Sequence, residues 1–249
     1  LCPGSRSAPL AIAAGELYKS GLIKLFNSID ERSAGFHALG ISAASGKITV
    51  VITTSGTAVA NLLPSAVEAD KSSHKVIFLT ADRPLNLKNC GANQTVNQED
   101  FLRPVCRSFL STNLGGIHLN NDSDIENLIK KIMMCHLLSS GPIHLNIPFQ
   151  KPLAIERKKR KSILSLSGKY PVKKKIIDLN LLKFKDENKS DGKLIQKFNG
   201  LASGIIIVGP YRGSNLDLNL FNDSLEKIQN FTGWPIFADP ISGVKSSMR

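Results

Sequence analysis

Over residues 1–150, short apolar runs alternate with longer stretches whose apolar residues recur at helical spacing. The run KITVVITT, 47–54, is rich in β-branched residues, which predicts a strand buried on both faces of a sheet. Strands that alternate with helices in this way form mostly parallel sheets. We expect strands at 22–27, 47–54, 75–81 and 141–148, and helices at 8–19, 31–45, 57–69 (interrupted at Pro64) and 122–140.

The pattern therefore predicts an α/β fold, a mostly parallel sheet with helices on both faces. A second α/β pattern follows, with expected strands at 204–213 and 234–243 around a helix that contains LEKIQN. Two strands cannot bury a sheet, so we expect this part to be incomplete and the chain to be a segment of a longer protein. The expected organisation is a first domain over 1–150, a basic linker region over 151–200 and the start of a central α/β domain over 201–249.

The positive charge is concentrated in the expected linker. The chain has a formal net charge of +12, and residues 151–200 hold 15 Lys or Arg against five Asp or Glu. Charge blocks of this kind are usually solvated linkers. Nucleic-acid-binding surfaces spread basic residues over a folded face and interleave aromatic ones, so nucleic-acid binding through this segment is the more remote alternative.

Composition restricts the cellular context. No apolar run approaches the roughly 20 residues that a membrane span needs, so we expect none. The four cysteines have no zinc-like spacing, which indicates free thiols in a reducing compartment. A cytoplasmic location is the expectation, with an organellar leader as the open alternative because the chain starts at Leu1 without a methionine.

Polar, glycine-bearing clusters follow the expected strands. Ligands gather at the carboxyl ends of parallel strands, so we expect these clusters to meet at one edge of the sheet. Each also has a purely structural interpretation: Asp30-Glu31 can bias a helix N-terminus and Ser55 can cap a helix. The clusters are Pro3-Gly4-Ser5-Arg6-Ser7, Asp30-Glu31-Arg32, Thr54 to Asn61, Thr80 to Pro84 and Gly91-Ala92-Asn93-Gln94.

Five of these motifs, in this order, carry a resemblance. CPGSRSAPL, DERSAGFHALG, TTSGTAVANLLPSAVEA, LTADRP and CGANQT resemble the thiamine-diphosphate enzymes that join 2-oxoglutarate to isochorismate in menaquinone and phylloquinone synthesis. The resemblance is dense over residues 1–100, clear at GPIHLNIPF (141–149) and thin afterwards. It implies that the first domain is of the type that binds the cofactor's pyrimidine ring.

The resemblance assigns roles to individual residues. Glu31 matches the glutamate that hydrogen-bonds the cofactor's aminopyrimidine ring and activates it, and we expect it to lie in a mostly apolar pocket. The turn Thr54-Ser55-Gly56-Thr57 matches the approach to the pyrimidine. Both substrates are polyanionic, and the guanidinium fork matches carboxylates. The expected substrate-binding residues are Ser5, Arg6, Arg83, Asn93 and Gln94.

The resemblance also implies what lies outside this chain. The diphosphate of thiamine diphosphate, with its Mg²⁺ (or Mn²⁺), would be bound by a C-terminal domain, so we expect no metal site in this chain. The active site would form between two subunits of a homodimer or a dimer of dimers. We expect the 249-residue chain by itself to be inactive.

A closely related alternative keeps the same domain plan. An acetolactate-synthase-like enzyme or a 2-oxo-acid decarboxylase would share Glu31. Against it stand Arg6 and Arg83 with Asn93-Gln94, because this set suits a substrate with more carboxylates than pyruvate.

Overall fold

The computed structural model describes residues 1–138, 140–154, 203–211 and 218–248. These residues belong to two compact units, Leu1–Gly168 and Lys169–Arg249. Most of the expected linker, 151–200, lies outside the described residues, so its boundaries stay a prediction.

The first unit is built on a four-stranded parallel sheet of order β1-β2-β4-β3. β2 and β4 are its central strands, and their apolar sequences explain why both faces are covered. The expected strands at 47–54, 75–81 and 141–148 are confirmed, and a fourth strand was missed. The strands are β1 (Thr49–Thr53), β2 (Val76–Asp82), β3 (Ser108–Ser111) and β4 (Ile143–Pro148).

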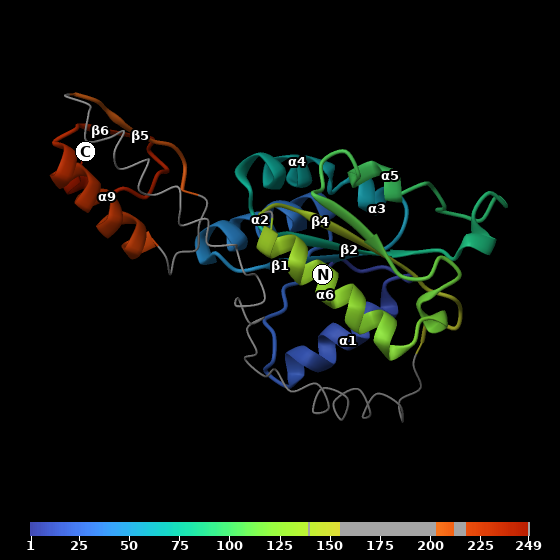
Figure 1. Cartoon of the computed structure of the whole chain (residues 1–249). Coiled ribbons are helices and arrows are strands. Elements are labelled where there is room, and N and C mark those ends of the chain that lie inside the picture. Colours follow the sequence, from blue (N-terminus) through green and yellow to red (C-terminus); the bar gives the residue numbers. More distant parts are fainter. Residues whose placement is uncertain (139, 155–202, 212–217, 249) are drawn as a thin grey trace. The chain divides into compact units, whose positions relative to one another are not determined.

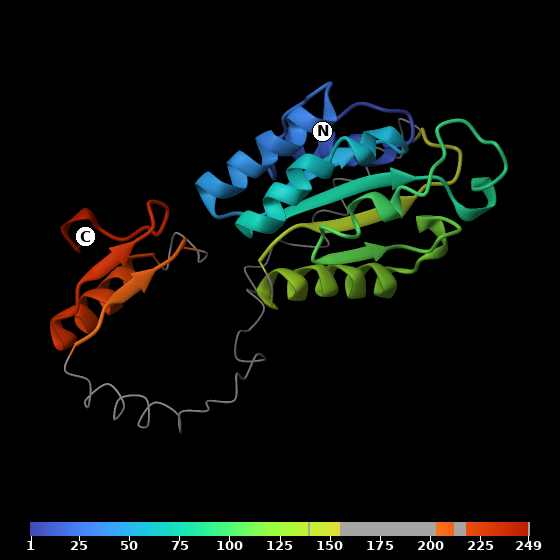
Figure 2. The same cartoon turned by 90° about the horizontal axis from the view of Figure 1, so that it is seen from above.

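Helices cover both faces of this sheet (Figures 1 and 2). One core cluster joins α2, α3, α4 and α5 to β1 and β2, around the fully buried Phe78. The other joins α6 and Leu10 of α1 to the opposite face. The expected α/β fold is therefore confirmed. The helix expected over 57–69 is interrupted, but the break lies at Asn61–Leu62, and Pro64 is in the first turn of the second helix. The helices are α1 (Ala8–Lys19), α2 (Glu31–Ser45), α3 (Thr57–Ala60), α4 (Leu63–Ser72), α5 (Glu99–Leu102) and α6 (Asp122–Leu138), with short 3-10 turns at Leu85–Leu87 and Ile117–Leu119.

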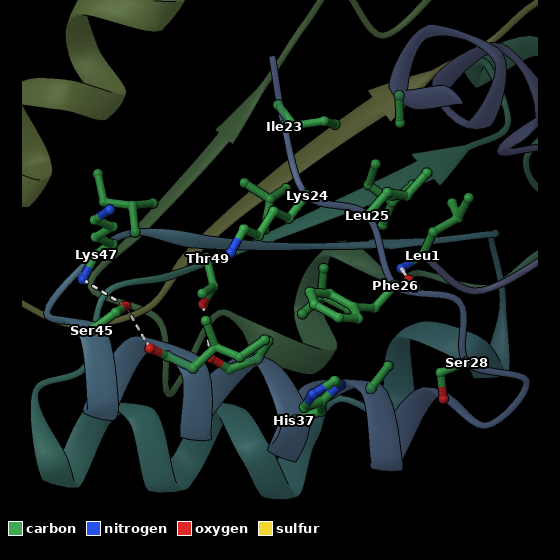
Figure 3. Close-up of a pocket in the computed structure, with 18 of the residues that line it drawn as sticks. Leu1, Ile23, Lys24, Leu25, Phe26, Ser28, His37, Ser45, Lys47 and Thr49 are labelled. Atoms are coloured by element: carbon green, nitrogen blue, oxygen red, sulfur yellow. Dashed lines mark hydrogen bonds between the residues drawn. The ribbon is translucent and has the colours of Figure 1, made fainter. Parts of the chain in front are cut away.

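The strand expected at 22–27 is wrong. Among the described residues this segment pairs with no other strand: the Leu1 amino group donates to the Phe26 carbonyl at 2.8 Å, and Ser28 N–H donates to the Leu1 carbonyl at 3.0 Å. A largely apolar pocket of about 630 Å³ separates this segment from β1. Figure 3 shows Ile23, Lys24 and Leu25 crossing the pocket opposite Thr49. An apolar run without a hydrogen-bonding partner cannot form a ladder.

The second unit contains a parallel pair of strands, β5 (Ile206–Val208) and β6 (Ile236–Ala238), joined through α9 (Leu218–Thr232). Leu225 of α9 packs with Ile236, Val244 and Met248 in a small core. A short 3-10 turn, Ser246–Met248, ends the described part. Both strands are shorter than the sequence predicts.

Close packing of α2 on α4 depends on Gly35. A Cβ at this position would lie 2.8 Å from the Ser65 Cβ and closer still to its hydroxyl. We expect Gly35→Ala to lower the free energy of unfolding by about 1–3 kcal/mol, because overpacking forces the helices apart. Gly40 lies on the same helix and faces open space, so Gly40→Ala should instead add roughly 0.5–1 kcal/mol. Urea unfolding followed by circular dichroism measures both, and a Gly35→Ala variant as stable as the unmodified chain would contradict the packing argument.

Candidate functional site

The loop between Cys2 and α1 holds Arg6 inside the first unit. Arg6 is only 7% exposed, and its Nη1 donates to the carbonyl of Phe149, just after β4, at 2.8 Å. Ser7 occupies the cap position of α1, but its hydroxyl donates to the Gly4 carbonyl instead of capping the helix. Gly4 lies against Thr54, where any Cβ would collide with the threonine side chain. The loop is thus fixed to the carboxyl ends of two strands.

Arg6 is a buried cation with a second cation nearby. Burial lowers the pKa of Arg6, the positive charge of Arg83 lowers it further, and Asp82 acts in the opposite direction. Asp82 is engaged elsewhere: its Oδ2 contacts Lys88 Nζ at 2.9 Å, and its Oδ1 accepts from Arg83 N–H at 2.7 Å. Among the described residues no carboxylate forms an ion pair with Arg6. A buried guanidinium without an ion-pair partner favours the binding of an anion.

Arg83 begins the loop that follows β2 and joins two of the expected clusters. Its Nη1 donates to the Ser55 hydroxyl at 2.5 Å and to the Gln94 carbonyl at 2.7 Å. Gln94 Nε2 in turn donates to the Ser55 carbonyl at 2.8 Å. The sheet edge therefore brings together Arg83, Ser55, Gly56 and Gln94, as the order of the strands predicted.

A buried ion triad anchors the same loop. Lys88 Nζ lies 2.9 Å from Asp82 Oδ2 and 2.8 Å from Glu99 Oε2, and the lysine side chain is 9% exposed. Burial opposes the charge on Lys88, but hydrogen bonds to Glu99 and Asp82 outweigh it, so the pKa of Lys88 is raised. The lysine ties the loop after β2 to the start of α5.

Glu31 lies apart from this group, at the first residue of α2. Asp30 caps the helix, accepting from Ser33 N–H at 2.7 Å. Asn61 Nδ2, just beyond α3, donates to Glu31 Oε2 at 3.2 Å. Within the described residues Glu31 is partly exposed, so these residues do not by themselves form the apolar pocket expected around it.

The remaining expected residues are less constrained. Ser5 and Asn93 are exposed, and Thr57 is exposed at the start of α3. Thr54 and Ser55 are buried in the turn after β1. None of the expected site residues lines the apolar pocket of Figure 3, which is bounded by α2, β1 and the segment 22–28.

Sequence reasoning missed two buried amides behind the site. Gln98 and Asn146 are each 1% exposed and hydrogen-bond to one another at 2.8 Å. Asn146 did carry a signal, a polar residue in the middle of the apolar run IHLNIP. Gln98 carried none, because it lies in a polar stretch whose burial depends on the tertiary fold.

His144 ends this polar row inside the sheet. Thr80 Oγ1 donates to Asn146 Oδ1 at 2.8 Å, so it accepts from His144 Nε2, also at 2.8 Å. Burial and, less strongly, the positive charge of Arg103 lower the pKa of His144 to about 4. His144 is therefore a core residue, although its Nδ1 has no partner among the described residues.

This shift predicts a pH dependence of stability. The unfolded chain protonates His144 below about pH 6.5, whereas the folded chain resists protonation down to about 4, so stability is complete above pH 6.5 and falls as the pH drops toward 4. His136 contributes in the same direction. Urea unfolding at pH 7.5 and pH 4.5 measures how far the free energy of unfolding falls between the two pH values. We expect this fall to be smaller by roughly 2–3 kcal/mol in His144→Gln than in the unmodified chain. Equal losses would contradict the assignment.

Comparison with known proteins matches residues 1–101 to the thiamine pyrophosphate enzyme N-terminal TPP binding domain. The first two fifths of the chain are therefore similar to this domain. The match agrees with the parallel sheet and the helices on both of its faces, and it includes the polar strand ends from Arg6 to Asn61.

Similar full-length proteins extend over the rest of the chain. A 2-succinyl-5-enolpyruvyl-6-hydroxy-3-cyclohexene-1-carboxylate synthase of Prochlorococcus marinus strain MIT 9515 is 61% identical over 252 residues, covering 100% of this chain and 42% of that protein. The synthases of strains MIT 9215 and NATL2A are 59% and 49% identical. The chain thus spans about two fifths of the length of the curated relatives that it matches.

The described residues contain no group of three or more His, Cys, Asp or Glu side chains arranged to hold a metal ion. They also contain no helix long and apolar enough to cross a membrane. The four cysteines are free thiols, and burial raises the pKa of Cys106 to about 12.

Proposed function

We propose that this chain forms part of a thiamine-diphosphate-dependent synthase that decarboxylates 2-oxoglutarate and adds the resulting succinyl group to isochorismate in 1,4 fashion. The product would be 2-succinyl-5-enolpyruvyl-6-hydroxy-3-cyclohexene-1-carboxylate, an intermediate of menaquinone or phylloquinone biosynthesis. The names of the relatives and the matched domain support this assignment. The observation that carries it is Arg6, a buried guanidinium close to Arg83 and without an ion-pair partner in the described residues.

Substrate carboxylates supply the anion that this arrangement favours. Arg6 and Arg83 each use Nη1 to hold the protein backbone, at Phe149 and Gln94 respectively, which orients the rest of the guanidinium fork. A fixed fork binds a carboxylate at a smaller entropic cost than a mobile one. In this proposal Ser5, Asn93 and Gln94 line the isochorismate side, where their amide and hydroxyl groups bind substrate oxygens.

In this proposal the pyrimidine end of thiamine diphosphate lies between the Ser55–Gly56 turn and Glu31. Gly56 has no Cβ to obstruct a flat ring, and a Cβ there would already meet Gln94 Cγ at 2.7 Å. Glu31 would hold the aminopyrimidine ring through its carboxyl, with Asn61 orienting that carboxyl. The bound cofactor supplies the electron sink for decarboxylation. We further propose that Mg²⁺ or Mn²⁺ binds outside this chain, and that a second copy of the protein faces Glu31.

The alternatives make different predictions. An acetolactate-synthase-like enzyme or a 2-oxo-acid decarboxylase is not favoured by the relatives, which carry the synthase name. Nucleic-acid binding rests on the basic segment 151–200, most of which lies outside the described residues, and would show affinity falling steeply with salt.

Substrate consumption tests the proposal. The longer protein that contains this chain is incubated with thiamine diphosphate and Mg²⁺, and either 2-oxoglutarate or pyruvate, with and without isochorismate. We expect carbon dioxide release from 2-oxoglutarate and product formation only when isochorismate is present. Consumption of pyruvate in preference to 2-oxoglutarate would overturn the substrate assignment.

A further inference from the structure

One peptide group at the candidate site is held at both ends by glutamines. The carbonyl of Ser55 accepts from Gln94 Nε2 at 2.8 Å, and the N–H of Gly56 donates to Gln98 Oε1 at 2.8 Å. Both backbone atoms belong to the same planar unit. Two side chains on opposite edges of one plane fix its rotation, which a single hydrogen bond would not do.

The orientation of Gln98 is fully determined by its surroundings. Its Nε2 donates to the Ala81 carbonyl at 3.0 Å and to Asn146 Oδ1 at 2.8 Å, while its Oε1 faces the Gly56 N–H. Both amide protons and the oxygen are therefore satisfied, in a side chain that is 1% exposed. A carboxylate of the same shape would place an oxygen against two acceptors.

Gln98 is itself braced by the centre of the sheet. Asn146 Nδ2 donates to Asp82 Oδ2 at 2.8 Å, and Asp82 also contacts Lys88. The turn after β1 is thus hydrogen-bonded, through Gln98 and Asn146, to the ends of β2 and β4. Rigid strands support the turn.

The fixed peptide group directs the chain toward Glu31. Gly56 has a φ of 88°, which glycine adopts without strain, and α3 begins at the next residue. The Gly56 carbonyl accepts from Val59 N–H at 3.0 Å, and the Asn61 N–H continues the helix to Thr57. Asn61 then donates to Glu31 Oε2. A rotation of the 55–56 peptide group would move the start of this short helix and with it Asn61.

We infer that Gln98 is a positioning residue. Its Oε1 accepts from the Gly56 N–H while Gln94 donates to the Ser55 carbonyl, and we call this pair of hydrogen bonds the clamp. The clamp sets the direction of α3 and so places the Asn61 amide on the Glu31 carboxyl. The meaning of this for catalysis rests on the proposed function, but the geometric statement does not. Gln94 has a second task as the other half of the clamp, beside the role expected for it toward substrate.

Amide exchange and NMR shifts of the 249-residue chain test the inference. We expect Gln98→Met, which removes the acceptor at similar volume, to speed exchange of the Gly56 amide by about tenfold, as loss of one buried hydrogen bond implies. The side-chain amide signals of Asn61 and the carboxyl signal of Glu31 should shift with it. Gln150→Met is the matched control, because Gln150 is exposed in the same unit, and it should change none of these signals.

Two further variants keep the test decisive. Gln94→Met removes the other half of the clamp from an exposed loop, so the chain should fold while the same Asn61 and Glu31 signals move. Gln98→Glu should be worse than Gln98→Met, since the carboxylate faces two acceptors. Unchanged Asn61 and Glu31 signals in folded Gln98→Met and Gln94→Met variants would overturn the inference.

Kinetics of the longer protein separate positioning from general stability. We expect Gln98→Met to lower kcat by about tenfold, with the KM for 2-oxoglutarate changed less than about twofold, because the arginines are untouched. If Gln98→Met instead raised the KM for 2-oxoglutarate and left kcat unchanged, a role of Gln98 in positioning Glu31 would be contradicted. If the longer protein turns over no 2-oxoglutarate at all, the proposed function fails, and the NMR result still decides the geometric statement.

Discussion

Glu31→Gln in the longer protein is expected to reduce carboligation of 2-oxoglutarate and isochorismate by about 10²–10⁴-fold, the range of a lost acid–base group. The amide keeps the shape of the side chain, and its oxygen can still accept from Asn61. It cannot exchange a proton with an aminopyrimidine ring. Initial rates at saturating substrate and cofactor measure the effect.

A matched control accompanies this variant. Glu68 is exposed on α4, away from the strand ends, so Glu68→Gln should leave the rate unchanged within about twofold. The assignment of Glu31 as the catalytic residue would be wrong if the Glu31→Gln variant, correctly folded and loaded with cofactor, retained near-native carboligation.

Arg83→Lys is expected to raise KM for the anionic substrates by about 10–100-fold, as loss of a charge-assisted hydrogen bond or two implies. The positive charge stays, but a lysine ammonium cannot hold Ser55 and the Gln94 carbonyl in the geometry of the guanidinium fork and still meet a carboxylate. Steady-state kinetics with 2-oxoglutarate and isochorismate varied separately identify which substrate depends on it.

Arg103→Lys provides the comparison for this substitution. Arg103 forms a surface ion pair with Asp100, the kind of interaction that contributes little energy. Its KM values should stay within about twofold of the unmodified protein. An Arg83→Lys variant with the same unchanged KM values would remove Arg83 from the substrate site.

The regular elements of the first unit could be predicted because their signals are local. Continuous β-branched runs gave β1, β2 and β4, and helical spacing gave α1 and α2 with the bounds seen in the structure. The strand expected at 22–27 failed because a strand needs a hydrogen-bonded neighbour, which sequence periodicity does not report. β3, SFLS, is half-buried at the sheet edge and too short to give a clear pattern.

The candidate site was predictable only in part. Strand order placed Arg83 near the turn at Ser55, since the carboxyl ends of parallel strands share an edge. The clamp on the Ser55–Gly56 peptide group could not be foreseen, because Gln98 lies 42 residues from Gly56 in sequence and is buried only in the folded unit. Long-range amide contacts of this kind leave no periodic trace in a single sequence.

The order of the strands also dictates when the site can form during protein synthesis. β4, which pairs with both β2 and β3, is the last strand of the first unit to leave the ribosome. Arg6, which precedes every strand of the first unit, bonds to the Phe149 carbonyl 143 positions later. The loop that carries Arg6 must therefore wait, solvated, until the 143 residues up to Phe149 have been translated. Assembly of the arginine site is a late, non-local event, of the kind that makes folding slow.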